Sequence, residues 1–215
     1  MKQTIISRFL AIALMMTTGN LAANAGWTDN LSPYDLNAPL GWATVDGNVT
    51  GGEGGTKVTV TNKTELMNAL KGTDKKIIYV DGEIEFSGLT NVNSVQNKTI
   101  IGMKGAAFVN SKHSASVSET GIMQLSSCKN IILRNIIFKS AGAYDIDGND
   151  NLTIIGSTYI WVDHCDFQDG VDGNFDCVNG SDNICVTWCR FRYLIAPWAG
   201  GSGGSNDHRN CDLWG

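Results

Sequence analysis

Short runs of β-branched residues, separated by Gly, Asn, Asp and Ser, recur along most of the chain and predict strands rather than helices. The first three such runs span residues 57–61, 76–80 and 98–101. One segment, 63–70, has apolar residues at helical spacing instead. The pattern therefore predicts an all-β fold with a single short helix that caps its N-terminal end.

Three nine-residue segments further along the chain align with one another. They cover residues 130–138, 159–167 and 183–191, so they recur at intervals typical of solenoid repeats. Apolar side chains fill the second, fourth, seventh and ninth columns of the alignment. These columns hold Ile131, Ile160 and Ile184; Leu133, Val162 and Val186; Ile136, Cys165 and Cys189; and Phe138, Phe167 and Phe191.

The spacing of these columns indicates a three-dimensional arrangement. Alternation by two is typical of a strand with one buried face, and the jump from the fourth column to the seventh indicates a corner that keeps the chain in the core. A strand, a corner and another strand, stacked coil on coil, form a right-handed, single-stranded parallel β-helix. A β-sandwich fits less well, because hairpin signals such as Asn-Gly are few.

The stacked coils also offer a structural explanation for several residues that could be taken for catalytic or binding groups. Cys165 and Cys189 share an interior column about 4.8 Å apart, which is compatible either with a disulfide or with two buried thiols. Asp163 and His164 fall at a corner, where hydrogen bonding to the turn is the favoured role over a catalytic dyad. The glycine-rich run 51–55 lacks the Lys-Ser/Thr ending of a phosphate loop and is interpreted as a turn.

The beginning of the chain has the features of a secretory signal peptide. Lys2 and Arg8 precede an apolar stretch, and Ala-Asn-Ala at 23–25 is a small-residue cleavage site. We therefore expect residues 1–25 to be removed and 26–215 to form one secreted β-helix domain, extracellular or periplasmic. The formal net charge of −5 argues against nucleic acid as a partner, and no apolar run is long enough to cross a membrane.

Acidic residues provide the main candidate for chemistry. Asp172 and Asp176 flank a short segment that contains Gly173; Phe175 and Cys177 alternate inward, so Asn174 and Asp176 are expected to face outward. The repeat register places Asp150, one coil earlier, against Asn174. Fully extended, Asp172 and Asp176 would lie about 13 Å apart, so the segment must bend at Gly173 to bring both to one cation. Clustered carboxylates repel one another unless they bind a cation, and oxygen-only ligands favour Ca²⁺. A solvated acidic face is the alternative.

At this point the sequence resembles a known family. The block Tyr-Ile-Trp-Val-Asp-His-Cys-Asp-Phe at 159–167, followed by Asp-Gly-Asn-Phe-Asp at 172–176, is similar to the central signature of family 1 pectate lyases. The segments 50–55 and 77–84 resemble the N-terminal part of that family. The resemblance implies a secreted parallel β-helix that cleaves polygalacturonate, the acidic polysaccharide of pectin, by β-elimination with Ca²⁺ bridging enzyme and substrate. It assigns the calcium ligands to Asp150, Asp172 and Asp176, with Asp147 and Asp145 as possible additions.

The chain departs from the family pattern in its last part. An Arg-x-Pro-x-x-Arg-like motif that supplies the catalytic base does not occur before Gly215, and Ile195 or Ala196 stands where a lysine is expected. His208 and Arg209 are candidates for contact with uronates, although an exposed, solvated pair is the simpler interpretation. No polar cap is evident after the 200–204 run, which predicts a truncated reading frame or a fragment of a longer lyase.

Three functions are compatible with these observations. The first is a Ca²⁺-dependent pectate lyase, or the N-terminal portion of one, for which the catalytic base stays unassigned. The second is a non-catalytic pectin-binding β-helix that holds Ca²⁺ and uronate without cleaving it. The third is an inverting polygalacturonase, which would use paired carboxylates as acid and base and would need no calcium. We expect a monomer, and little or no turnover from these 215 residues alone.

Overall fold

The strands form three parallel sheets that wind into a β-helix. The computed structural model describes residues 39, 41–47, 49–142, 144 and 146–195. The first sheet contains β1 (Thr56–Val60), β2 (Lys76–Val80), β5 (Gln96–Gly102), β8 (Lys129–Arg134), β11 (Thr158–Asp163) and β14 (Asp182–Thr187). The second contains β4 (Thr90–Asn93), β7 (Met123–Ser126), β10 (Leu152–Ile155) and β13 (Phe175–Val178). The third contains β3 (Glu83–Glu85), β6 (Ala107–Asn110), β9 (Ile137–Ser140), β12 (Asp166–Gln168) and β15 (Arg190–Arg192).

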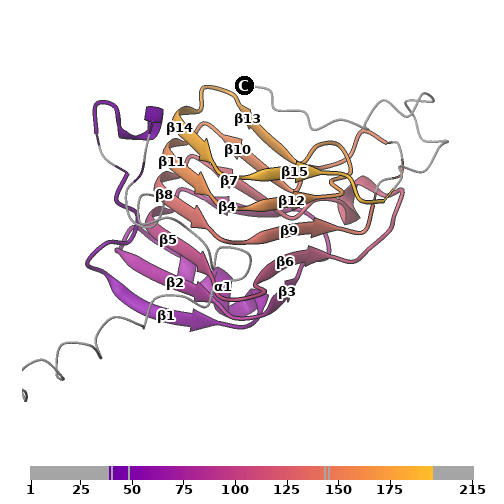
Figure 1. Ribbon diagram of the computed structural model, residues 1–215, viewed down its shortest axis with the longest axis horizontal. Coiled ribbons are helices and arrows are strands. Elements are labelled where there is room, and N and C mark those ends of the chain that lie inside the picture. The colour runs from indigo at the N-terminus through magenta and orange to yellow at the C-terminus, as the bar shows by residue number, and fades with distance from the viewer. Residues whose placement is uncertain (1–38, 40, 48, 143, 145, 196–215) are drawn as a thin grey trace, which may run out of the picture.

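Each complete coil passes through the three sheets in the same order. The chain runs from the second sheet to the first and then to the third, as in β7–β8–β9, β10–β11–β12 and β13–β14–β15. Neighbouring coils pair in parallel, and Figure 1 shows them stacked from β1 at one end to β13, β14 and β15 at the other. The predicted right-handed parallel β-helix is therefore confirmed. The strand over 76–80 is found with the predicted bounds, and those over 57–61 and 98–101 differ by one or two residues.

The apolar columns predicted from the repeat form the core. Ile131, Ile160 and Ile184 face one another across β8, β11 and β14, and Phe138, Phe167 and Phe191 do so across β9, β12 and β15. The rings of Phe138 and Phe167 stack with centroids 4.8 Å apart, and those of Phe167 and Phe191 with centroids 5.0 Å apart. In-register stacking of identical side chains places each apolar group on another of its own shape, which keeps the interior tightly packed.

The corner between the first and third sheets is made by a residue in the left-handed conformation. Asn135, His164 and Trp188 occupy this position in successive coils with φ of 56°, 52° and 53°. Beside it the buried Asp163 carboxylate accepts hydrogen bonds from Arg134 Nε at 2.8 Å and Thr187 Oγ1 at 2.6 Å. His164 Nδ1 lies 2.8 Å from the same carboxylate, and both side chains are buried. The pair lies buried at the predicted corner, but Asp163 bonds to side chains of neighbouring coils, whereas hydrogen bonding to the turn backbone had been predicted.

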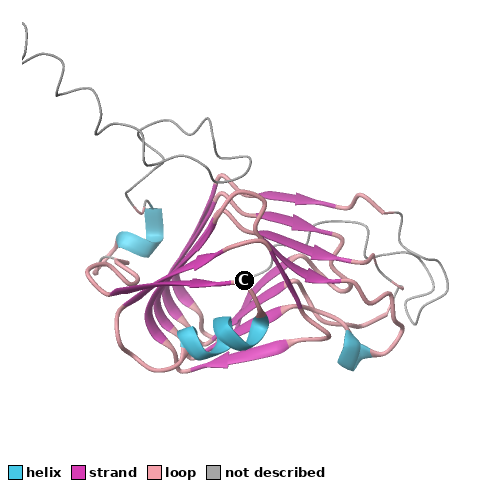
Figure 2. Cartoon of the chain, turned by 90° about the horizontal axis from the view of Figure 1, so that it is seen from below, coloured by secondary structure: helices cyan, strands magenta, loops and turns pink. Residues whose placement is uncertain are grey.

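Among the described residues the one α-helix, α1 (Lys63–Leu70), has the bounds that its apolar spacing predicts. Asn62 caps its N-terminus by accepting a hydrogen bond from Glu65 N at 3.0 Å, and the Glu65 carboxylate accepts one from Thr61 N at 2.8 Å. This pattern resembles a capping box, except that Glu65 reaches back to Thr61, the residue before the N-cap. The apolar face of α1 packs on the core at the N-terminal end of the stack, as Figure 2 shows.

Two short 3₁₀-helices of the described part of the chain lie outside the sheets, η2 (Gly41–Thr44) and η3 (Val117–Glu119). The glycine-rich run 51–55 is a turn, as predicted, with Glu53 N bonded to Thr50 O and Gly55 N to Gly52 O. Within the described residues the cysteines are free thiols, so Cys165 and Cys189 follow the thiol alternative. No helix among the described residues is long and apolar enough to span a membrane.

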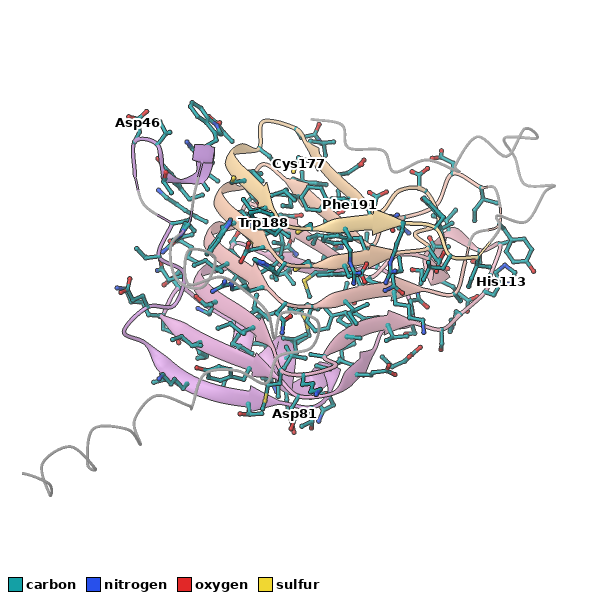
Figure 3. All side chains as sticks on the ribbon, viewed as in Figure 1. Asp46, Asp81, His113, Cys177, Trp188 and Phe191 are labelled. Carbon is teal, nitrogen blue, oxygen red and sulfur yellow. The ribbon has the colours of Figure 1, made fainter. Side chains whose placement is uncertain are left out.

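Within residues 39–195, the last described coil, β13–β14–β15, has a neighbouring coil on one side only. Its inward side chains, which include Cys177, Ile184 and Phe191, are half-buried, whereas the corresponding Ile154, Ile160 and Phe167 one coil earlier are fully buried. Figure 3 shows Cys177, Trp188 and Phe191 on this coil.

Candidate functional site

Asp150 lies at the entrance to β10, where the chain passes from the third sheet into the second. Its side chain is buried, and Oδ2 accepts a hydrogen bond of 2.7 Å from Thr153 Oγ1. Burial raises the pKa of the Asp150 carboxyl, and hydrogen bonds from Thr153 and from the Gly173 backbone oppose that shift only in part. A buried carboxylate is stabilised by a neighbouring cation, so this position favours one.

Gly173 separates Asp150 from Asp176. A methyl group placed on Gly173 would lie 2.9 Å from Asp150 Oδ1 and 3.6 Å from Asp176 Oδ1. The oxygens of two carboxylates from adjacent coils therefore both approach the space beside Gly173, the open point, which the absence of a side chain at Gly173 leaves unfilled. The predicted meeting of Asp150 with Asp176 beside Gly173 is present in the structure.

The register that produces this meeting differs by one residue from the prediction. Leu152 pairs with Phe175 and Asn151 N donates to Gly173 O, so Asp150 lies opposite Gly173 and not opposite Asn174. The reason is a difference in turn length. Residues 156–157 connect β10 to β11, whereas residues 179–181, one residue more, connect β13 to β14. The pairing offset between coils is therefore 24 residues in the first sheet (Ile160 with Ile184) and 23 in the second (Leu152 with Phe175), so an offset taken from the first sheet is wrong by one in the second.

Asn174 also differs from its predicted orientation. It was expected to face outward with Asp176, but it is completely buried and lies in the bend before β13. Its Oδ1 accepts hydrogen bonds from Asn151 Nδ2 at 2.9 Å and from Gly170 N at 3.1 Å. Asn151 in turn accepts a hydrogen bond of 2.6 Å from Ser140 Oγ. Because this segment bends and is not an extended strand, the alternation that predicts an outward Asn174 does not apply to it.

The other predicted site residues lie in the bend before β13, in the loop before β10, or outside the described residues. Asp172 is half-buried in the bend next to Gly173, and Asp147 is exposed. Asp145, His208 and Arg209 lie outside the described residues. Across the described part of the chain, no group of three or more His, Cys, Asp or Glu side chains is arranged to hold a metal ion. The structure thus brings together two of the three predicted calcium ligands, Asp150 and Asp176.

A pair of carboxylates around an open point fits a hard divalent cation. Calcium takes six to eight oxygen ligands, of which water and a bound anion can supply several. The donors here are all oxygen atoms, which excludes the thiolate-rich and imidazole-rich chemistry of zinc and copper sites. The residues present therefore fit a calcium site in which Asp150 and Asp176 supply the protein ligands and water and a bound anion supply the rest.

Sequence reasoning missed the groups that hold Asp150 in place. Thr153 lies three residues after Asp150 on β10, and Asn151 pairs with Asn174 beneath the site. The only signal in the sequence is that polar residues alternate with Leu152 and Ile154, which places Thr153 on the outer face of the sheet.

The position where a family lysine is expected is apolar and exposed. Leu194 and Ile195 follow β15, and their backbone N–H groups donate to the buried Asp169 Oδ1 at 2.6 and 2.9 Å. Their side chains are exposed. This loop is therefore anchored through its backbone, and Ile195 supplies no cation there.

Together these features define a parallel β-helix with a candidate cation site between two adjacent coils. A model of the pectate lyase family matches residues 12–191 of the chain. The chain is 32% identical over 167 residues to the pectate trisaccharide-lyase of Thermotoga maritima, covering 71% of this chain and 42% of that protein. It is also 32% identical over 178 residues to pectate lyase plyB of Emericella nidulans, covering 79% of this chain and 49% of that protein. The chain belongs to the pectate lyase family.

Solved structures support the fold. A mutant of Bacillus subtilis pectate lyase matches with a TM-score of 0.53 and 23% identity, over 71% of this chain and 59% of the other. A pectate lyase bound to a hexasaccharide matches with a TM-score of 0.54 and 22% identity, over 68% and 56%. Jun a 1, the major allergen from cedar pollen, matches with a TM-score of 0.54 and 18% identity, over 69% and 47%. The chain spans roughly half the length of the two curated relatives it matches.

Proposed function

We propose that this chain is the calcium- and substrate-binding part of a secreted pectate lyase that acts on polygalacturonate by β-elimination. The observation that carries the proposal is the open point beside Gly173, which the oxygens of Asp150 and Asp176 approach from adjacent coils. Membership of the pectate lyase family, and a relative bound to a hexasaccharide, support an acidic polysaccharide as the ligand.

Charge explains why a cation is needed. The protein carries a formal net charge of −5, and polygalacturonate is a polyanion, so a uronate carboxylate is repelled from Asp150 and Asp176. When bound, calcium would bridge the protein and uronate carboxylates and withdraw charge from the latter, which acidifies the adjacent C5 proton. In this arrangement Asp150 and Asp176 bind, and Thr153 orients Asp150.

The proton acceptor is not assigned to any residue of the described chain. Elimination requires a base that removes the C5 proton while the C4 oxygen leaves. Asp150 and Asp176 are engaged at the cation, and Ile195 supplies no basic group where the family resemblance places a lysine. We therefore expect tight calcium-dependent binding of polygalacturonate and little or no turnover from these residues alone. We also expect a monomer exported through residues 1–25.

The experiment measures binding and chemistry on the same samples. The chain is incubated with polygalacturonate in calcium and in a chelator, and three quantities are followed: retention of the polysaccharide, absorbance of the unsaturated product, and new reducing ends. Retention that needs calcium and is lost in Asp150→Asn supports the proposal. Unsaturated product in calcium identifies a complete lyase, and reducing ends without unsaturation identify a hydrolase. Equal retention in calcium and chelator contradicts the proposed site.

A further inference from the structure

We propose that Thr153 is a positioning residue that sets the affinity of the site for divalent cations. The inference rests on the proposed function, because it concerns how Asp150 is presented to the cation. Thr153 donates from Oγ1 to Asp150 Oδ2 at 2.7 Å. This bond occupies one carboxylate oxygen, while the other, Oδ1, faces the open point beside Gly173.

Thr153 is itself held firmly. It lies within β10 between the inward-facing Leu152 and Ile154, and it is almost fully buried. Its β-branched side chain has restricted χ1 freedom, so its hydroxyl cannot move far from Asp150 without rotating the whole side chain. A hydrogen bond to a charged group is also stronger than one between neutral groups. Thr153 therefore restricts the Asp150 carboxylate to one orientation.

The same residue connects Asp150 with the neighbouring coil. In the β10–β13 pairing, Thr153 lies directly opposite Asp176. On its other side it lies opposite Gln124 of β7. Thr153 thus pairs with Asp176 through the backbone register and bonds to Asp150 through its side chain. It therefore fixes the Asp150 carboxylate relative to the strand that carries Asp176.

A separate set of buried contacts keeps the two coils in register beneath the site. Asn151 Nδ2 donates to Asn174 Oδ1 at 2.9 Å and to Gln168 O at 2.8 Å. Because Asn151 follows Asp150 and Asn174 follows Gly173, this pair holds the backbone at the entrances to β10 and β13. The backbone is therefore fixed independently of Thr153, and loss of the Thr153 hydroxyl releases the Asp150 side chain alone.

The test compares three variants of the full chain by calorimetric titration with Ca²⁺ alone. Thr153→Val keeps the branched shape and removes the hydroxyl, and Thr153→Ser restores a hydroxyl. Thr187→Val is the matched control, because Thr187 Oγ1 donates a similar bond of 2.6 Å to the buried Asp163 on a different sheet. Melting temperatures in a chelator report on stability separately.

We expect Thr153→Val to weaken Ca²⁺ binding by about tenfold, the lower end for loss of a hydrogen bond to a charged group. Thr153→Ser should bind within about threefold of the parent, and Thr187→Val should lower the melting temperature without changing Ca²⁺ affinity. Equal affinity of the parent and Thr153→Val, or equal weakening by Thr187→Val, overturns the role of Thr153 and leaves the proposed function intact. A parent that binds no Ca²⁺ overturns both.

Discussion

Replacing Gly173 by alanine tests whether the open point between the carboxylates is the cation site. The added methyl group would lie 2.9 Å from Asp150 Oδ1, closer than a carbon and an oxygen atom pack, and 3.6 Å from Asp176 Oδ1, an ordinary contact. Gly173 does not have a positive φ, so the backbone can accept alanine without strain. The substitution therefore acts by filling the space, and Asp150 must move away from it.

The size of the effect follows from what Asp150 loses. Displacing one carboxylate from a cation removes at least one charge-assisted contact, worth about 1.5–3 kcal/mol, which corresponds to about 10- to 150-fold in affinity. The cost to folding should be about 1–3 kcal/mol, because Asp150 can move away from the methyl group only by straining its hydrogen bond to Thr153.

The assay is calorimetric titration with Ca²⁺, with thermal unfolding in a chelator to measure stability. Gly148→Ala is a suitable control, since its methyl group would lie 2.6 Å from Val171 Cγ1 and so crowds the neighbouring loop without entering the space between the carboxylates. A Gly173→Ala protein that binds Ca²⁺ as tightly as the parent would refute the placement of the cation at this point.

Four further predictions follow from buried groups. Asp150→Asn should abolish the rise in melting temperature caused by Ca²⁺ and should not lower the melting temperature in a chelator, because burial penalises the charged form; a clear loss of stability without metal would contradict this. Asp163→Ala should cost about 3–5 kcal/mol in urea unfolding, since it leaves the partly buried Arg134 without its carboxylate; a cost under 1 kcal/mol would show that the pair is not coupled. Phe138→Ala should cost about 3–5 kcal/mol in the same assay, because the ring is buried between those of Phe108 and Phe167. An unchanged denaturation midpoint would show that this stack of rings does not stabilise the fold. Burial and the nearby Asp176 raise the pKa of Cys177 to about 12, so at pH 8 the thiol stays protonated and alkylation should be at least about 100-fold slower than in urea, approaching the unfolded rate only as the pH nears that pKa; equal rates at pH 8 would refute the shift.

The solenoid could be predicted from the sequence because the core residues recur at the same positions of each repeat. Ile131, Ile160 and Ile184 recur at the same place in each repeat, and identical side chains stacked in register leave one arrangement that buries them all. The corner at His164 was predicted by the same logic, since the jump between columns requires a change of direction there.

The site could be predicted only in part, because it lies where the repeat is irregular. The sequence places Asp150 and Asp176 near each other, but the exact register depends on a turn whose length changes between coils. The burial of Asn174 could not be predicted, since it depends on a bend that no periodic pattern describes. Thr153 was missed because a single threonine on an outward strand position is most often exposed to solvent.

The extra residue in the turn between β13 and β14 has a consequence for how such proteins diversify. The two sheets differ by one residue in the offset between paired strands, because the extra residue lies entirely in the turn 179–181. Ile160 still pairs with Ile184 in the first sheet, and Leu152 pairs with Phe175 in the second. A one-residue insertion or deletion in a turn can therefore be accepted while the Asp150–Asp176 pair and every interior column stay in place.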